Sequence, residues 1–180
     1  MILSVGEALI DMLPRTSPAG EPCFAPYAGG AVMNTAIALS RLGSQSAFLT
    51  GLSSDLMGDV LRDTLAASNV NLDHAVQSYR PTTLAFVKLT NGHASYFFYD
   101  ENTAGRMMTI ADMPTLPDTI TAYFTGGIWL AVEPCGTTLE ALLTREAATR
   151  VTMIDPNVRP TFVRDRAAYT ARIDRMIGLS

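Results

Sequence analysis

Short apolar runs alternate with amphipathic stretches along this chain, and the alternation limits its fold more than any other feature of the sequence. The expected strands, such as "ILSV", "AYFTGG" and "VTMID", are continuous apolar runs, and apolar residues recur with helical spacing in residues 55–69. Continuous apolar strands are typical of a parallel sheet whose two faces are both covered. We therefore predict one α/β domain with a doubly wound, mostly parallel sheet covered by helices.

Residues 82–100 depart from this pattern, because their apolar residues alternate with a period of two. The pair Asn91-Gly92 divides the segment into "TTLAFVKLT" and "ASYFFYD". Such a pair supplies the two positive φ angles of a type I′ turn. The sequence thus predicts a β hairpin over residues 82–100, set apart from the main sheet.

The charge and composition of the chain exclude several classes of partner. The net charge is -4 over 180 residues and the basic residues are scattered, which argues against nucleic acid and against an anionic membrane surface. No apolar run reaches the roughly 18 residues that a membrane span needs. Cys23 and Cys135 have no CxxC spacing, and only two histidines occur. We expect reduced thiols, a cytoplasmic location and no metal site in these residues.

The stretch "AGGAVMNTAIALSRLG" predicts a helix that begins at two adjacent glycines, Gly29 and Gly30, and ends at Gly43. A helix N-terminus presents free N–H groups, and glycine lets a ligand approach them closely. Asn34 lies one turn further on, and helical side chains lean toward the N-terminus, so its amide is expected to reach back over Gly30. Two interpretations stay open: a ligand site, or glycines that only permit tight packing while Asn34 bonds to the backbone.

Polar residues follow several expected strands at the points where these strands end. They are Asp11, Glu133, Asp155, Asn157 and Arg159. Ligands of open α/β sheets bind beyond the carboxyl ends of the strands, so we expect these side chains and the glycine pair to share one rim. Carboxylates, an amide and free N–H groups suit a polyhydroxylated ligand, whose hydroxyls both donate and accept. For Asp155, which precedes a proline, a turn cap is the alternative.

Five segments resemble the ribokinase-like, or PfkB-type, carbohydrate kinases, and they occur in the order of that family. They are "GEALIDM", "AGGAVMNTAIALSRLG", "GLSSDLMGDVL", the hairpin segment and "DPNVRP". The resemblance spans essentially the whole chain, and the last segment is similar to a strand end typical of fructokinases and ketodeoxygluconate kinases. It implies transfer of the γ-phosphate of ATP, accompanied by Mg²⁺, to a hydroxymethyl group of a sugar.

Fructose is the substrate that the resemblance favours, with 2-keto-3-deoxygluconate or a nucleoside as alternatives within the same fold. An acid sugar calls for an extra cation near the hairpin, whereas Asp100 and Glu101 stand there. A neutral sugar is therefore the expected substrate. A non-catalytic sugar-binding protein is the alternative from a different functional class.

The resemblance assigns sugar contacts residue by residue. Arg159 is also expected to neutralise phosphate charge during transfer. Tyr96 and Phe98 share one face of the hairpin, which the resemblance identifies as a lid that closes over the sugar. The aromatic run "SYFFY" on an unpaired strand edge predicts that the lid also joins two copies in a homodimer. Hairpin packing or a dimer contact is the alternative role of these two rings. The expected sugar contacts are Asp11, Gly29, Gly30, Asn34, Tyr96, Phe98, Arg106, Glu133, Asn157 and Arg159.

Two segments of the family pattern are missing from this chain. It contains no DTxGAGD-type loop, where the family places its catalytic base and the amides that hold the transferring phosphate, and no N-x-x-E segment. We therefore expect residues 1–180 to be the N-terminal part of one longer kinase domain, without the C-terminal ATP-binding part. No catalytic base is expected in these residues, and alone they are expected to be inactive.

Overall fold

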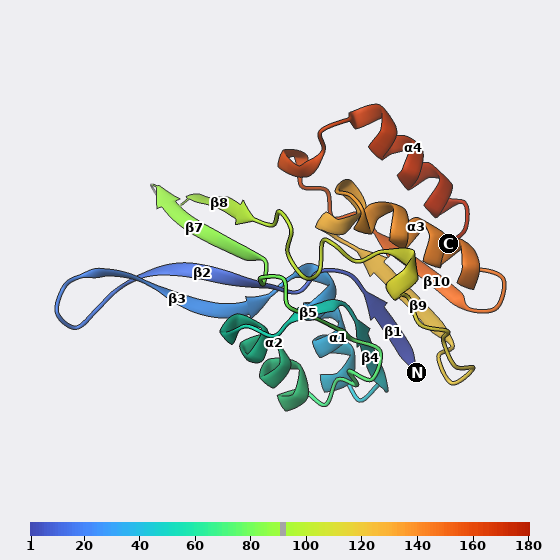
Figure 1. Cartoon of the computed structure of the whole chain (residues 1–180), viewed down its shortest axis with the longest axis horizontal. Helices are drawn as coiled ribbons and strands as arrows, with labels where there is room; N and C mark the ends of the chain where they lie inside the picture. The colour runs from blue at the N-terminus through green and yellow to red at the C-terminus, as the bar shows by residue number, and fades with distance from the viewer. Residues whose placement is uncertain (91–92) are drawn as a thin grey trace.

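A four-stranded parallel sheet forms the centre of the molecule, and the computed structural model describes residues 1–90 and 93–180 of the chain. Every neighbouring pair of strands in this sheet runs parallel. A helix separates each strand from the next one along the chain (Figure 1). The prediction of a mostly parallel α/β sheet is confirmed. The strands lie in the order β10 (Val151–Asp155), β9 (Ala122–Gly126), β1 (Ile2–Val5) and β4 (Ser46–Leu49).

Helices cover both faces of this sheet, as Figure 1 shows. Successive side chains of a strand point to opposite faces. Phe48 of β4 accordingly packs in the apolar cluster that contains α1 and α2, whereas its neighbour Leu49 packs in the cluster that contains α3 and α4. Two buried clusters therefore stabilise the sheet, one on each face. The helices are α1 (Ala31–Arg41), α2 (Leu56–Ala67), α3 (Cys135–Glu146) and α4 (Arg166–Ile177).

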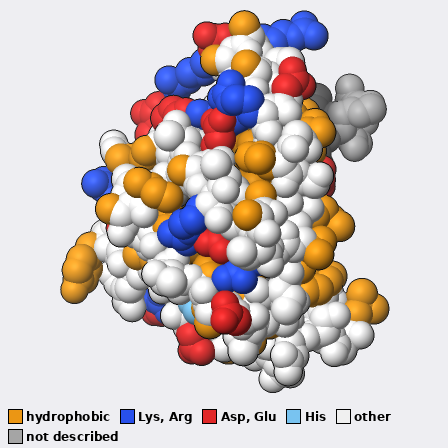
Figure 2. Space-filling view, turned by 90° about the vertical axis from the view of Figure 1, so that its right-hand side faces the viewer, with side chains coloured by type: hydrophobic (Ala, Val, Ile, Leu, Met, Phe, Trp, Pro, Cys, Tyr) orange, Lys and Arg blue, Asp and Glu red, His pale blue; other side chains and the backbone are white. Residues whose placement is uncertain are grey.

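Apolar contacts and ion pairs hold α4 against α3. Arg175 Nε donates to Glu140 Oε1 over 2.5 Å, and Arg172 Nε lies 3.4 Å from Oε2 of the same carboxylate. Figure 2 shows Lys or Arg side chains next to Asp or Glu side chains on this side of the molecule. Solvent screens these partly exposed pairs, so burial of Ile173 and Met176 contributes more to the attachment.

A second sheet of four strands projects from the first one (Figure 1), and we call it the lid. β7 and β8 form the predicted antiparallel hairpin, while the predicted Asn91-Gly92 turn lies outside the described residues. The hairpin is set apart from the main sheet as predicted, but it is part of a larger sheet than the sequence indicated, because β2 pairs with both β7 and β3. The sequence does not predict β3, because Pro22 and Pro26 argue against a strand. β3 lies at the edge of its sheet, where proline is tolerated. The order is β3 (Pro22–Gly29), β2 (Leu9–Thr16), β7 (Leu84–Thr90) and β8 (His93–Tyr99).

Short elements complete the described part of the chain. β5 (Gly51–Ser53) pairs with β6 (Val76–Ser78) in parallel. Among the described helices, none is long and apolar enough to cross a membrane. Three short 3₁₀ turns span Ile110–Asp112, Ile128–Ala131 and Pro160–Phe162.

Asp55 joins the base of the lid to the start of α2. Its Oδ1 accepts from Gly58 N over 2.7 Å, which caps the helix. The same carboxylate accepts from Thr82 Oγ1 over 2.6 Å and from Thr82 N over 2.8 Å, just before β7 begins. Burial raises the pKa of Asp55, but the hydrogen bonds from Thr82 and Gly58 outweigh it, so its pKa lies below the ordinary value.

We expect Asp55→Ala to lower the free energy of unfolding by about 1–2 kcal/mol at neutral pH, because it removes the cap of α2 and the bonds to Thr82. A lowered pKa means that this stabilisation is present above the ordinary value of 3.8 and is lost as pH falls through the folded-state pKa. Urea unfolding at several pH values measures both effects. Asp63→Ala, on an exposed position of the same helix, is the control, and an equal loss in both variants would contradict the assignment.

Candidate functional site

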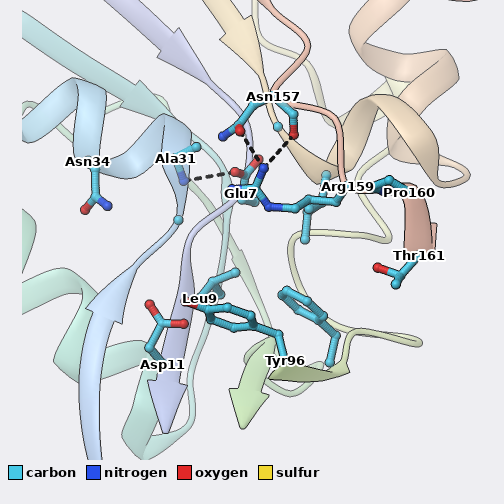
Figure 3. A pocket seen from close by; sticks show the side chains of 14 residues that line it. Glu7, Leu9, Asp11, Ala31, Asn34, Tyr96, Asn157, Arg159, Pro160 and Thr161 are labelled. Carbon is cyan, nitrogen blue, oxygen red and sulfur yellow. Dashed lines mark hydrogen bonds between the residues drawn. The ribbon is translucent and has the colours of Figure 1, made fainter. Parts of the chain in front are cut away.

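One cavity of about 650 Å³ opens where the main sheet meets the lid. Glu7 follows β1, Gly127 follows β9 and Asn157 follows β10, so the carboxyl ends of three parallel strands form its floor. The entrance of α1 and the inner faces of β2 and β8 form its walls (Figure 3). It is lined by Glu7, Leu9, Asp11, Gly30, Ala31, Asn34, Tyr96, Phe98, Gly127, Ile128, Asn157, Arg159, Pro160 and Thr161.

Seven of the ten residues expected to bind sugar line this cavity. An eighth, Gly29, lies next to it in β3, and a Cβ atom there would come within 2.5 Å of Asp11 Oδ2. Glycine at this position therefore leaves room for the Asp11 carboxylate. The seven are Asp11, Gly30, Asn34, Tyr96, Phe98, Asn157 and Arg159.

The entrance of α1 requires glycine at position 30. Gly30 has a φ of 109°, and a Cβ atom there would lie 2.8 Å from the carbonyl oxygen of Glu7. A side chain would be strained by the backbone angle and blocked by this close approach. Asn34 is exposed to the cavity one turn further on, and within the described residues its side-chain amide makes no hydrogen bond. Tight packing thus accounts for Gly30, whereas the Asn34 amide does not bond to the backbone of the described residues and faces the cavity.

Asp11 lies inside β2 and points into the cavity (Figure 3). Partial burial raises its pKa above the ordinary value. Within the described residues the Asp11 carboxylate accepts no hydrogen bond. A desolvated acceptor without a partner is prepared to bind a hydroxyl donor from a ligand.

Arg159 brings positive charge to the cavity from the loop after β10. Its Nη1 donates to Asn157 Oδ1 over 2.6 Å and to the Asn157 carbonyl oxygen over 3.2 Å. Asn157 N in turn donates to Asp155 Oδ1 over 3.0 Å. Asp155 therefore caps the turn, while Asn157 and Arg159 face the cavity.

Aromatic side chains of β8 divide between the two faces of the lid. Tyr96 and Phe98 face the cavity, with ring centroids 6.1 Å apart and planes inclined by 21°. Phe98 also packs edge to face on Phe162, with centroids 4.7 Å apart. Phe97 and Tyr99 point to the outer face of the lid.

Arg106 and Glu133 lie outside this cavity, in a neighbouring hollow of about 270 Å³. Arg106 Nη1 lies 3.3 Å from Asp100 Oδ2, and its Nε donates to the Glu133 carbonyl oxygen over 3.2 Å. The Glu133 carboxylate accepts from Arg172 and from Thr137 N. Burial raises the pKa of Glu133, but the bonds from Arg172 and Thr137 outweigh it and hold the pKa below its ordinary value. Protein partners thus occupy both groups that the resemblance assigns to sugar.

Glu7 lines the floor of the cavity and was not among the residues expected from the sequence. Its side chain is only 3% exposed, and its Oε1 accepts from Ala31 N over 3.0 Å. Burial raises its pKa to about 7, although backbone N–H groups and the charge of Arg159 oppose the shift. A carboxylate inside the apolar run "ILSVGEALI" is the signal that marks it in the sequence.

The described residues contain no group of three or more His, Cys, Asp or Glu side chains that could hold a metal ion. The charged groups of the cavity are instead two carboxylates and one guanidinium, Glu7, Asp11 and Arg159. Such a set can bind neutral hydroxyl groups and one region of negative charge.

Known proteins with similar sequences include several fructokinases. The chain is 58% identical over 180 residues to a fructokinase of Rhizobium leguminosarum bv. trifolii and 35% identical over 170 residues to fructokinase-2 of Solanum lycopersicum. These matches cover 100% and 88% of this chain but 55% and 51% of the relatives, so the chain spans about half of their length.

The fold has close counterparts among solved structures. The structure of fructokinase with bound ATP from Xylella fastidiosa superposes with a TM-score of 0.89 at 29% identity, covering 99% of this chain and 55% of that one. The pfkB family carbohydrate kinase model matches residues 1–179. The chain belongs to the pfkB family of carbohydrate kinases.

Proposed function

We propose that this chain forms the sugar-binding side of an ATP-dependent fructokinase. The observation that carries the proposal is the cavity itself, where, among the described residues, the side chains of Asp11 and Asn34 present polar groups without protein partners at the carboxyl ends of three strands. Free donors and acceptors around one opening suit a molecule with many hydroxyls. The named fructokinases among the relatives support the same substrate.

Each polar group has a distinct part in this proposal. Asp11 accepts hydrogen bonds from sugar hydroxyls, and Asn34 both donates and accepts. The rings of Tyr96 and Phe98 cover the sugar from the lid. Arg159 attracts the negative charge of the phosphoryl group as it reaches the sugar.

The charges of the cavity favour a neutral sugar over an acid sugar. Glu7 and Asp11 already place two carboxyl groups there, and Arg159 is the cation among the described lining residues. Asp100, at the end of β8, holds Arg106 in an ion pair away from the cavity. A substrate carboxylate would therefore meet more negative than positive charge.

We further propose that the catalytic base and the ATP-binding loop belong to the part of the relatives' length that this chain does not span. The ATP-bound neighbour from Xylella fastidiosa supports ATP as the phosphate donor. Mg²⁺ would enter with the ATP phosphates, but the described residues form no set of ligands for it. We assign no step to a metal from this chain.

Two free thiols, Cys23 and Cys135, support a cytoplasmic location.

We expect Asp11→Ala to weaken fructose binding by about 10–150-fold, or about 1.5–3 kcal/mol, because a charged acceptor for a sugar hydroxyl is lost. ATP affinity should change little. Calorimetry on the protein as its gene encodes it measures both, with ketodeoxygluconate, ribose and adenosine as competing ligands. Asp118→Ala, at an exposed position outside the cavity, is the control.

Unchanged fructose affinity in Asp11→Ala would remove Asp11 from the site. Tighter binding of ketodeoxygluconate or adenosine than of fructose would overturn the substrate assignment. Fructose binding without ATP consumption would identify a sugar-binding protein rather than a kinase.

We also propose that the outer face of the lid joins two copies of the chain. Phe24, Phe97 and Tyr99 are 48%, 55% and 64% exposed there, and the rings of Phe24 and Tyr99 each pack edge to face on Phe86. An exposed aromatic face of this kind, on a sheet with free edges, is normally covered by another surface.

We expect Phe97→Glu to convert a dimer into a monomer at micromolar concentration, because it places a charge in the centre of this apolar face. Sedimentation velocity measures the change. Tyr79→Glu replaces an aromatic side chain that is 97% exposed elsewhere and should leave the dimer intact. A wild-type protein that stays monomeric with and without fructose would contradict this proposal.

A further inference from the structure

The carboxyl group of Glu7 lies where three parts of the cavity floor meet. Its Oε1 accepts from Ala31 N, the first residue of α1, over 3.0 Å. A Cβ atom on Gly127, after β9, would come within 2.1 Å of Oε2, so only glycine fits beside the carboxyl. Arg159 reaches toward Glu7 from the loop after β10 (Figure 3), and its charge acts on the carboxyl.

The main chain of Glu7 holds the same helix entrance. Its carbonyl oxygen accepts from Met33 N over 3.3 Å and lies against Gly30. The side chain and the main chain of one residue therefore fix the first turn of α1. Asn34 projects from that turn, so the position of its amide depends on Glu7.

Burial of the Glu7 carboxyl at this place lowers the stability of the fold, because the group loses its contact with water. Glu7 is 3% exposed, and its Oε2 has no hydrogen-bond partner among the described residues. A glutamine would keep the bond from Ala31 N at a lower desolvation cost. A buried carboxyl that stability alone does not explain is a candidate for a role in the site.

We propose that Glu7 is a positioning residue of the sugar site. Its carboxyl group holds the entrance of α1 and the Arg159 side chain in the positions at which they contact the sugar. The proposal rests on the proposed sugar-binding function of the cavity. Glu7 acts through Asn34, Gly30 and Arg159 rather than by contact with the reacting atoms.

The strength of this positioning depends on whether Glu7 is ionised. A carboxylate accepts a stronger hydrogen bond from Ala31 N than a neutral carboxyl does, and it attracts both the helix N-terminus and Arg159. Its pKa of about 7 places the change at neutral pH. α1 and the Gly127 turn present only main-chain groups to it. The other titratable groups that line the cavity are Asp11, Tyr96 and Arg159.

Sugar affinity should therefore rise as pH rises through about 7. The contribution of Glu7 to the free energy of unfolding should instead fall as pH rises. A raised carboxyl pKa contributes stability that is fully present below the ordinary value of 4.5 and is lost as pH rises from there through the folded-state value of about 7. Glu7→Gln should accordingly bind fructose more weakly at pH 8 without losing thermal stability there. A residue with only a capping role would show no change in sugar affinity.

The test measures fructose affinity by calorimetry between pH 6 and pH 8 on the protein as its gene encodes it. We expect binding to be up to about tenfold weaker at pH 6, where about a tenth of Glu7 is ionised. Glu7→Gln should bind weakly at both pH values. Glu21→Gln, on an exposed loop, should keep the full pH dependence of the wild type.

The outcomes separate this inference from the function on which it rests. No fructose binding at any pH would overturn the proposed function. Fructose binding whose pH dependence persists in Glu7→Gln would overturn the inference alone, because a group other than Glu7 would then titrate.

A second measurement applies even where Glu7→Gln does not fold. Carbon-13 NMR of the glutamate carboxyls in the wild type should find one group that titrates near neutral pH. Saturating fructose should lower its apparent pKa, because sugar binds the ionised form more tightly. An apparent pKa that fructose leaves unchanged would overturn the inference.

Discussion

The approach of Gly30 to the main chain of Glu7 is the contact on which the rest of the site depends. With a φ of 109° and no Cβ, Gly30 lets α1 begin directly above the end of β1. Helix N–H groups and the Asn34 amide thereby face the carboxyl ends of the parallel strands. A bulkier residue would push the helix entrance away, and the lid and the β10 loop would then surround an opening without the Asn34 amide.

The two sheets contribute different chemistry around that contact. The parallel sheet supplies rigid strand ends, from which Glu7 and the Asn157–Arg159 pair project. The lid supplies Asp11 from β2 and the rings of β8. Asp55 and Asp100 fix the base of the lid through Thr82 and Thr83. The carboxylate that we propose to accept sugar hydroxyls and the cation that we propose to attract phosphate thus come from separate parts of the fold.

Sequence patterns predict the parallel sheet, its helices and seven of the fourteen residues that line the cavity, because apolar periodicity and strand-end position are local properties. They do not predict β3, because it contains two prolines and proline is tolerated only in an edge strand. That β3 lies at the edge of its sheet is known only from the folded structure. They place Glu133 and Arg106 at the site by motif, but Arg172 and Asp100 engage these groups instead. They overlook Glu7, because its role depends on α1 and Gly127, which are distant in the sequence.

A crystal structure of the protein as its gene encodes it, with fructose bound, tests the central claim most directly. Our account predicts that the sugar lies in the cavity between the lid and the strand ends, with a hydroxyl donating to Asp11 and another bonded to the Asn34 amide. Its hydroxymethyl group should face the side from which Arg159 projects. A sugar bound in the hollow beside Glu133 and Arg106, or on the outer face of the lid, would contradict the account.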